Sequence, residues 1–267
     1  MDYLDINKKS WDQRTATHVK SEFYNVAGFL DGETSLREIE LAEMVEVAGK
    51  ALLHLQCHFG MDTLSWARKG AVVTGVDLSP VAIEQANRLK EKAGLDARFL
   101  CSDVYEFGEQ AADQYDIVFT SYGALCWLPD LDRWAQAVAR CLRPGGRFYI
   151  VEFHPAYDLY AGYSYFHQEQ ADIEESGTYT ENCDGTETKT ATWAHTLGDV
   201  VNALLAAGIT IDHLNEFPFS PYNCFEGMEE RTPGRYYIHQ GEQDVPLIYS
   251  ILGTKTALKP SWVTKSA

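Results

Sequence analysis

The chain has 267 residues, enough for one large hydrophobic core or two modest ones, and its apolar and charged content is ordinary for a globular protein. Its formal net charge at pH 7 is −17, and no Lys or Arg cluster offsets that charge, so neither nucleic acid nor an anionic membrane is expected as a partner. No apolar run approaches the ~20 residues of a membrane span, and the N-terminal stretch MDYLDINKKSWDQR lacks the apolar segment of a secretory signal.

The six cysteines indicate a reducing compartment. No two of them form a Cys-x-x-Cys pair, and several fall inside predicted strands or helices. Free thiols of this kind favour a cytoplasmic protein over a disulfide framework or a zinc site. The cysteines are Cys57, Cys101, Cys126, Cys141, Cys183 and Cys224.

The first 48 residues are expected to be helical and to stand outside the main fold, with an apolar stripe of helical spacing over 35–47. Strands and helices then alternate. The run Ser79-Pro80 supplies an N-cap and a first-turn proline for one helix, and Arg143-Pro144-Gly145-Gly146 ends another. Strands are expected at 51–55, 71–77, 97–101, 116–121 and 147–153, and helices at 61–69, 80–93 and 131–142.

Two aromatic-rich interruptions follow, at 154–194 and 217–244. In the first, Thr178–Trp193 is expected to form a hairpin of two Thr-rich strands around Asp184-Gly185. Between the interruptions, a capping box at Thr196 begins a predicted helix. The remaining elements are expected to be that helix at 197–207 and strands at 209–216 and 246–254.

The alternation predicts an α/β protein with a mostly parallel sheet covered on both faces, whose ligands bind at the carboxyl ends of the strands. No helix joins the last two strands, so they are expected to pair antiparallel. The most informative stretch is Ala51–Asp77, which reads as strand, loop, helix and strand. Its second strand ends on Asp77, whose carboxylate can take both hydroxyls of a ribose, so a nucleoside cofactor is expected.

Five sequence pieces in this order and spacing resemble the class I S-adenosylmethionine-dependent methyltransferases. They are HLQCHFGMDTLSWA, VTGVDLSP, FLCSDVYEF, YDIVFTSYGALCWLPDL and RCLRPGGRFYIVEFHP. The resemblance is good over 51–153 and moderate over 195–254. It implies one methyltransferase domain over 1–267 with a Rossmann-like, seven-stranded, mostly parallel sheet and an antiparallel last strand. Its parts would be an N-terminal helical cap (1–48), a cofactor-binding core (49–153), lid insertions (154–194 and 217–244) and segments that complete the sheet (195–216 and 245–256).

The resemblance also implies residue roles for S-adenosylmethionine. The loop of Leu55, Gln56, Cys57, His58 and Gly60 would run beneath the methionine part of the cofactor. Asp77 would hold the ribose, and Leu78 would pack on the adenine. Ser102, Asp103 and the Val104 amide would meet the adenine edge, and Ser121 and Tyr122 would lie nearest the sulfonium and the acceptor. The alternative for Asp77 and Asp103 is that they only cap strand ends.

The first loop departs from the family pattern of an acidic residue followed by three spaced glycines. His54 stands at the acidic position, Gln56 and His58 replace two glycines, and only Gly60 remains. Because glycine allows positive φ and close approach of the backbone to a ligand, the loop geometry is left open by these substitutions. They resemble a bacterial subgroup variant. Gln56 can bond the amino acid end of the cofactor, or Gln56 and His58 simply satisfy the turn. No metal is expected, because no fourth ligand joins His54, Cys57 and His58.

The expected chemistry is in-line methyl transfer to N or O of a small metabolite, which needs alignment and exclusion of water more than a catalytic dyad. A base is needed only if the acceptor loses a proton late, and the candidates are His154, Tyr122, His195 and Glu152. Each of these has a purely structural alternative. Tyr122 is followed by Gly-Ala, not by the segment typical of nucleic acid amino-methyltransferases, which again argues against DNA and RNA.

Aromatic residues in the cap and the interruptions are expected to form a lid that holds an aromatic or cationic acceptor by stacking or cation–π contact. The alternative is a small satellite core under long loops. The candidates for acceptor binding are Trp11, Tyr24, Tyr157, Tyr160 and Trp193.

Three rival functions remain open at this stage. An aminopropyltransferase would need acidic residues beside the strand at 116–121, and SYGALCW offers none. A nicotinamide dehydrogenase would need an intact Gly-x-Gly-x-x-Gly, which is missing. A non-catalytic relative acting through a partner is supported only by the altered first loop. Monomer and homodimer are both compatible with the sequence.

Overall fold

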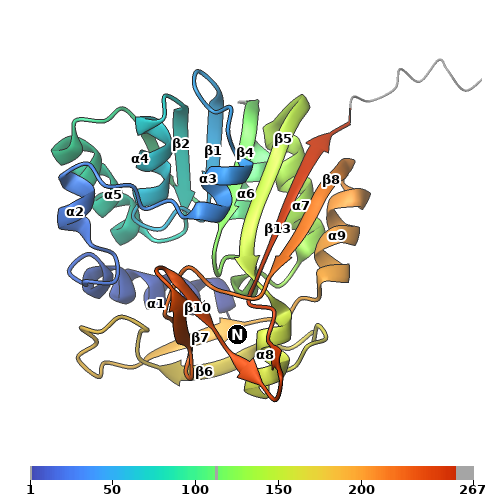
Figure 1. Ribbon diagram of the computed structural model, residues 1–267. Helices are drawn as coiled ribbons and strands as arrows, with labels where there is room; N and C mark the ends of the chain where they lie inside the picture. Colours follow the sequence, from blue (N-terminus) through green and yellow to red (C-terminus); the bar gives the residue numbers. More distant parts are fainter. Residues whose placement is uncertain (1, 112–113, 257–267) are drawn as a thin grey trace, which may run out of the picture.

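A computed structural model describes residues 2–111 and 114–256 of the chain. Its centre is a seven-stranded sheet in the order β3-β2-β1-β4-β5-β13-β8 (Figure 1). The first four pairs are parallel, while β13 runs antiparallel to both β5 and β8, so the expected fold with one antiparallel last strand is confirmed. The strands are β1 Ala51–Leu55, β2 Val72–Asp77, β3 Arg98–Cys101, β4 Tyr115–Ser121, β5 Leu142–Phe153, β8 Ile209–Phe217 and β13 Ile248–Lys255.

The strands are buried on both faces because apolar residues occupy successive positions and point alternately to opposite sides. In β1, Leu52 joins one core cluster while Leu53 and Leu55 join the other. In β5, Tyr149 and Val151 belong to the first cluster, and Phe148 and Ile150 to the second. The sheet thus has one hydrophobic core on each of its two faces.

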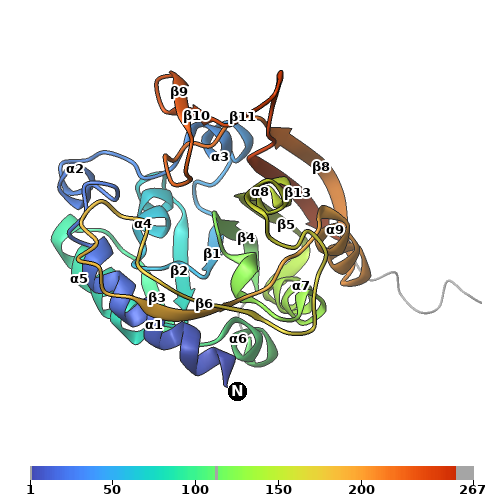
Figure 2. The same ribbon diagram turned by 90° about the horizontal axis from the view of Figure 1, so that it is seen from below.

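Helices cover both faces of the sheet (Figure 2). The first core contains apolar residues of α3, α4 and α5, and the second contains those of α6, α7 and α9. These helices are α3 Glu38–Glu43, α4 Met61–Arg68, α5 Pro80–Ala93, α6 Val104–Gln110, α7 Leu131–Cys141 and α9 Leu197–Ala206. The predicted proline and serine start of α5 is confirmed, since Ser79 Oγ accepts from the Ala82 N–H.

Parts of the cap and of the interruptions lie below the carboxyl ends of the parallel strands, where α1, α8 and the β6–β7 hairpin cross the end of the sheet (Figures 1 and 2). These elements are α1 Tyr3–His18, α2 Val26–Leu30, α8 Pro155–Ala161, β6 Asp172–Ser176, β7 Thr188–Thr192, β9 Glu229–Thr232, β10 Arg235–Tyr237, β11 His239–Gln240 and β12 Gln243–Asp244, with a single 3₁₀ turn η1 Leu125–Trp127 after β4. In the part of the chain that the structure describes, no helix is long and apolar enough to cross a membrane.

Three expected elements differ in the structure. The hairpin strand before Asp184-Gly185 lies at Asp172–Ser176, because β6 pairs with β7 in a register that leaves 177–187 as a loop. Helix α1 fixes that register: Asn7 Nδ2 donates to the Ala191 carbonyl, and the Ala191 N–H donates to Asn7 Oδ1. The stripe over 35–47 is helical only at Glu38–Glu43, and β5 begins at Leu142 instead of 147.

Candidate cofactor and acceptor site

A cavity of about 800 Å³ lies at the carboxyl ends of the parallel strands. Four neighbouring strands supply its floor in sheet order: Asp103 follows β3, Asp77 ends β2, Gln56 follows β1 and Ser121 ends β4. The structure therefore brings most of the predicted site residues together around one cavity. Those lining it are Gln56, Cys57, His58, Gly60, Asp77, Leu78, Ser102, Asp103, Val104, Ser121, Tyr122, Trp11, Tyr24 and Trp193.

The altered first loop keeps a glycine-like backbone. Gln56 has φ of 57° and His58 has φ of 51°, both in the left-handed region that normally favours glycine, and Gly60 has φ of 82°. Local bonds hold this conformation. The Cys57 N–H donates to the Val76 carbonyl at 2.9 Å, and the His58 N–H donates to Asp77 Oδ2 at 2.7 Å. Gln56 and His58 thus adopt backbone conformations of the kind that glycine favours.

Gln56 leaves one polar atom for a ligand. Its Nε2 donates to the Ala124 carbonyl at 2.8 Å, which anchors the side chain beneath the turn after β4. Its Oε1 is buried and has no hydrogen-bond partner among the described residues. A buried acceptor without a partner is costly unless a donor arrives, so this atom suits the ammonium group of a bound amino acid moiety.

Asp77 stands beside this loop with both oxygens oriented by backbone donors. Oδ2 accepts from His58, and Oδ1 accepts from the Ser79 N–H at 2.9 Å. Burial raises the pKa of Asp77 to about 6, partly offset by those two N–H donors. Each carboxylate oxygen has a second lone pair, so an oriented Asp77 can still accept from two ribose hydroxyls.

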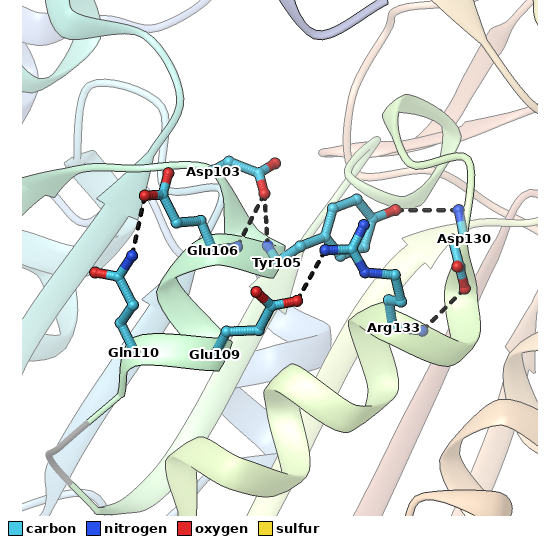
Figure 3. Close-up of polar contacts among 7 residues, drawn as sticks. All are labelled: Asp103, Tyr105, Glu106, Glu109, Gln110, Asp130 and Arg133. Atoms are coloured by element: carbon cyan, nitrogen blue, oxygen red, sulfur yellow. Dashed lines mark hydrogen bonds and ion pairs between the residues drawn. The ribbon is translucent and has the colours of Figure 1, made fainter.

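Asp103 is held at the N-terminus of α6 (Figure 3). Its Oδ1 accepts from the Tyr105 and Glu106 N–H groups, while no bond to its Oδ2 occurs among the residues that the structure describes. Tyr105 Oη in turn accepts from the Asp130 N–H at 3.0 Å, which ties α6 to the start of α7. Asp103 is thus both a helix cap and a carboxylate with one oxygen free for a ligand.

A polar network sits under the junction of β1 and β4. His54 bonds Thr63 Oγ1 through Nδ1 at 2.8 Å and meets Ser121 Oγ through Nε2 at 3.3 Å. Burial lowers the pKa of His54 to about 4, so the imidazole is neutral near pH 7. Asp62 of α4 accepts from Ser121 Oγ at 3.1 Å and from Ser35 Oγ at 2.6 Å. Asp62 is thus a carboxylate beside His54 and Ser121 that also lines the cavity, and sequence reasoning missed it.

Tyr122 is paired with a buried acid that sequence reasoning did not identify. Its φ is 31°, an unusual value for a side chain of this size, and its hydroxyl donates to Glu40 Oε2 at 2.7 Å. Glu40 is fully buried, and burial raises its pKa to about 7, with the Asp62 charge adding to the effect. Tyr122, which lines the cavity, is therefore bonded to a buried carboxyl group whose pKa lies close to neutrality.

The rest of the cavity is an aromatic chamber, defined here as Trp11, Phe23, Tyr24, Trp127, Tyr179 and Tyr222. Its rings are connected edge to face or stacked. Trp11 meets Trp127 at 5.2 Å between centroids, and Phe23 meets Tyr222 at 5.5 Å. Tyr222 also meets Tyr122 at 5.0 Å, which connects the chamber to the end of β4. These rings come from α1, the α1–α2 connection, η1 and both interruptions.

Several predicted residues lie elsewhere. His154 caps α8 through the Ala156 N–H and bonds Glu216, and His195 bonds the Leu128 carbonyl. Glu152 is buried and accepts from the N–H groups of Gly123, Ala124 and Leu125, so it orders the turn after Tyr122. None of these three lines the cavity, nor do Leu55, Tyr157 and Tyr160.

The three outlying apolar and aromatic residues have other surroundings. Leu55 is buried in the core, and Tyr157 stacks on Phe225 with ring centroids 3.8 Å apart. Tyr160 is exposed on α8. Their predicted site roles have no contact with the cavity to support them.

The strand order, the parallel register and the row of ligand-facing residues at the strand ends define a class I methyltransferase fold. A family model described as "Methyltransferase domain" matches residues 53–150, so the predicted resemblance to class I S-adenosylmethionine-dependent methyltransferases is confirmed.

Curated relatives cover part of the chain. Ubiquinone biosynthesis O-methyltransferase from Aeromonas salmonicida is 35% identical over 104 residues, which is 38% of this chain and 42% of that protein. The protein of the same name from Coxiella burnetii is 28% identical over 144 residues, 52% of this chain and 60% of that protein. The chain thus matches about half the length of these relatives.

Solved structures share the fold across most of the chain. A putative S-adenosylmethionine-dependent methyltransferase from Listeria monocytogenes aligns with a TM-score of 0.56 at 20% identity, covering 82% of this chain and 97% of that one. An S-adenosylmethionine-dependent methyltransferase from Methanosarcina mazei aligns with a TM-score of 0.59 at 20% identity, covering 83% and 99%.

Proposed function

We propose that this protein transfers a methyl group from S-adenosylmethionine to a hydroxyl oxygen of a small molecule. The single observation that carries the proposal is the continuity of one cavity across two chemically different ends. One end is the carboxylate end, formed by Asp77 and Asp103 beside Gln56, and the other is the aromatic chamber. The two ends meet at the turn of Ser121 and Tyr122.

The carboxylate end fits the cofactor. Asp77 would hold the ribose hydroxyls, Asp103 would accept from the adenine amino group, and Gln56 Oε1 would accept from the amino acid end. When bound, the cofactor supplies a methyl group already activated by a positively charged sulfur. The residues of this chain then have to fix the two partners in line and keep water away.

Oxygen is favoured over nitrogen by two observations. The curated relatives are named as O-methyltransferases. A hydroxyl also carries a proton that must leave, and the Tyr122–Glu40 pair offers a place for it: Tyr122 is the only one of the predicted bases that lines the cavity in the described part of the chain. In this arrangement Tyr122 accepts from the acceptor hydroxyl and passes its own proton to Glu40.

The proposal is tested first by calorimetry on the purified chain with S-adenosylhomocysteine and with NADH. Binding of the first and not of the second is expected. A screen with radiolabelled S-adenosylmethionine and hydroxylated metabolites then tests transfer. Tight binding of NADH would contradict the proposal, and binding of S-adenosylhomocysteine with no methyl uptake by any acceptor would favour a non-catalytic relative instead.

A further inference from the structure

The aromatic chamber contains a buried guanidinium that the proposed transfer does not use. Arg14 of α1 lines the cavity and is only 9% exposed. Its Nε donates to Ser10 Oγ at 3.1 Å, and its Nη2 donates to the Gly177 carbonyl at 3.2 Å. Both acceptors are neutral, so these bonds fix the position of the guanidinium without offsetting its charge.

No carboxylate pairs with Arg14 anywhere in residues 2–111 and 114–256. Burial lowers its pKa, and the groups that raise it are Tyr179, Cys126, Cys183 and Tyr24, none of which is a carboxylate. The arginines at the surface behave differently. Arg133 pairs with Glu109, and Arg235 pairs with Glu38. A buried cation without a counter-charge is destabilising unless something supplies that charge.

Two other arginines, Arg37 and Arg133, line the cavity, and Arg133 is already paired with Glu109. Arg37 lies over the Tyr222 ring, with Cζ 4.5 Å from the centroid. Although burial lowers it, the pKa of Arg37 is raised overall through Tyr222, Asp62 and Glu40. Arg14 is therefore the cation of this cavity whose surroundings lack an acid, and it lies among rings that suit a planar apolar ligand.

We propose that the acceptor is a small aromatic molecule bearing a carboxylate, and that this carboxylate pairs with Arg14 while the ring lies against the aromatic chamber. This inference rests on the proposed methyl transfer. A guanidinium matches a carboxylate in two parallel N–H···O bonds, which fixes direction as well as charge. A cationic acceptor would instead meet a like charge in the pocket.

A carboxylate also occurs on the amino acid end of the cofactor, so the test must separate the two sources. The probes are 4-hydroxybenzoate, its neutral amide 4-hydroxybenzamide, S-adenosylhomocysteine and 5′-methylthioadenosine, which lacks the amino acid end. Binding of the two aryl probes is measured by calorimetry on the full chain saturated with S-adenosylhomocysteine. The variants are Arg14→Gln and Arg14→Lys, with Arg88→Gln as a charge-matched control, because Arg88 is exposed on α5 and pairs with Glu84 outside the cavity.

In the wild type, 4-hydroxybenzoate is expected to bind about tenfold or more tightly than the amide. Arg14→Gln should abolish that preference, Arg14→Lys should retain part of it, and Arg88→Gln should leave it unchanged. The affinity for S-adenosylhomocysteine should not change in any variant, which also shows that each one is folded.

Three results would overturn the inference. The first is a wild type that binds 4-hydroxybenzoate no more tightly than 4-hydroxybenzamide, or that does not bind either compound at millimolar concentration. The second is a preference that survives in Arg14→Gln. The third is a loss of S-adenosylhomocysteine affinity in Arg14→Gln with unchanged 5′-methylthioadenosine affinity, which would assign Arg14 to the cofactor. In each case, binding of S-adenosylhomocysteine by the wild type leaves the proposed function standing. If the wild type does not bind S-adenosylhomocysteine, the proposed function itself is contradicted.

Discussion

The two ends of the cavity are built in different ways. The carboxylate end comes from consecutive strand ends of one sheet, so Asp77 and Asp103 lie side by side because β2 and β3 are paired. The aromatic chamber comes from four separate parts of the chain, and Phe23 meets Tyr222 across a long sequence separation. A site built from paired strand ends is rigid, and its residues can be predicted from the sequence. A chamber built from lid segments can come to bind a different ligand while the fold stays the same.

Glu40 gives the largest expected effect, and it tests whether the chamber end is built for proton transfer. A buried acid whose pKa is raised from 4.5 to about 7 binds its proton more tightly in the folded state. The contribution of Glu40 to the free energy of unfolding is therefore fully present below pH 4.5. It is lost as the pH rises through about 7, by about 3 kcal/mol in total. Glu40→Gln should remove most of that loss, as measured by urea unfolding at several pH values.

A wild type and a Glu40→Gln variant with parallel stability–pH profiles would contradict that assignment. Glu43→Gln is the matched control, since Glu43 is a neighbouring acid of α3 that bonds Tyr149 and Asn215 outside the cavity.

Asp77 tests the carboxylate end. Asp77→Ala should weaken binding of S-adenosylhomocysteine by about 1–3 kcal/mol, because the ribose hydroxyls lose their acceptor. Calorimetry measures the change, and Asp96→Ala, an exposed site near β3, is the control. The preference for an aryl carboxylate should survive in Asp77→Ala, since the two ends bind different groups. An unchanged nucleoside affinity would refute the role of Asp77.

Gly108 tests whether the carboxylate end depends on packing behind it. A Cβ at Gly108 would lie 2.2 Å from Ala137 Cβ and 2.5 Å from Ala137 Cα, so α6 and α7 would have to separate. Gly108→Ala should cost about 1–3 kcal/mol of unfolding free energy. Because Asp103 caps α6, nucleoside affinity should fall as well. Gly198→Ala in α9, whose nearest neighbour is 3.4 Å away, should be close to neutral. Equal stability of both variants would show that α6 and α7 are not held this closely.

Gln56 gives the smallest expected effect and lies where the two ends meet. Gln56→Ala removes the unpartnered Oε1 and should weaken S-adenosylhomocysteine by about 0.5–1.5 kcal/mol. Affinity for 5′-methylthioadenosine should be unchanged, because that ligand has no amino acid end. Equal losses for both ligands would mean that Gln56 acts only by holding the turn through Ala124.

Local patterns in the sequence determined the sheet, its covering helices and the carboxylate end. Alternating apolar runs define strands, Ser79 and Pro80 define a helix start, and parallel strands bring their carboxyl ends to one edge. Only the tertiary structure decided that Gln56 and His58 keep left-handed backbone conformations, because the loop donates hydrogen bonds to Val76 and Asp77. It also brought Glu40 to Tyr122 and left Arg14 without a carboxylate partner among the described residues. Those relations depend on contacts between segments far apart in the chain, and no local pattern of residues records them.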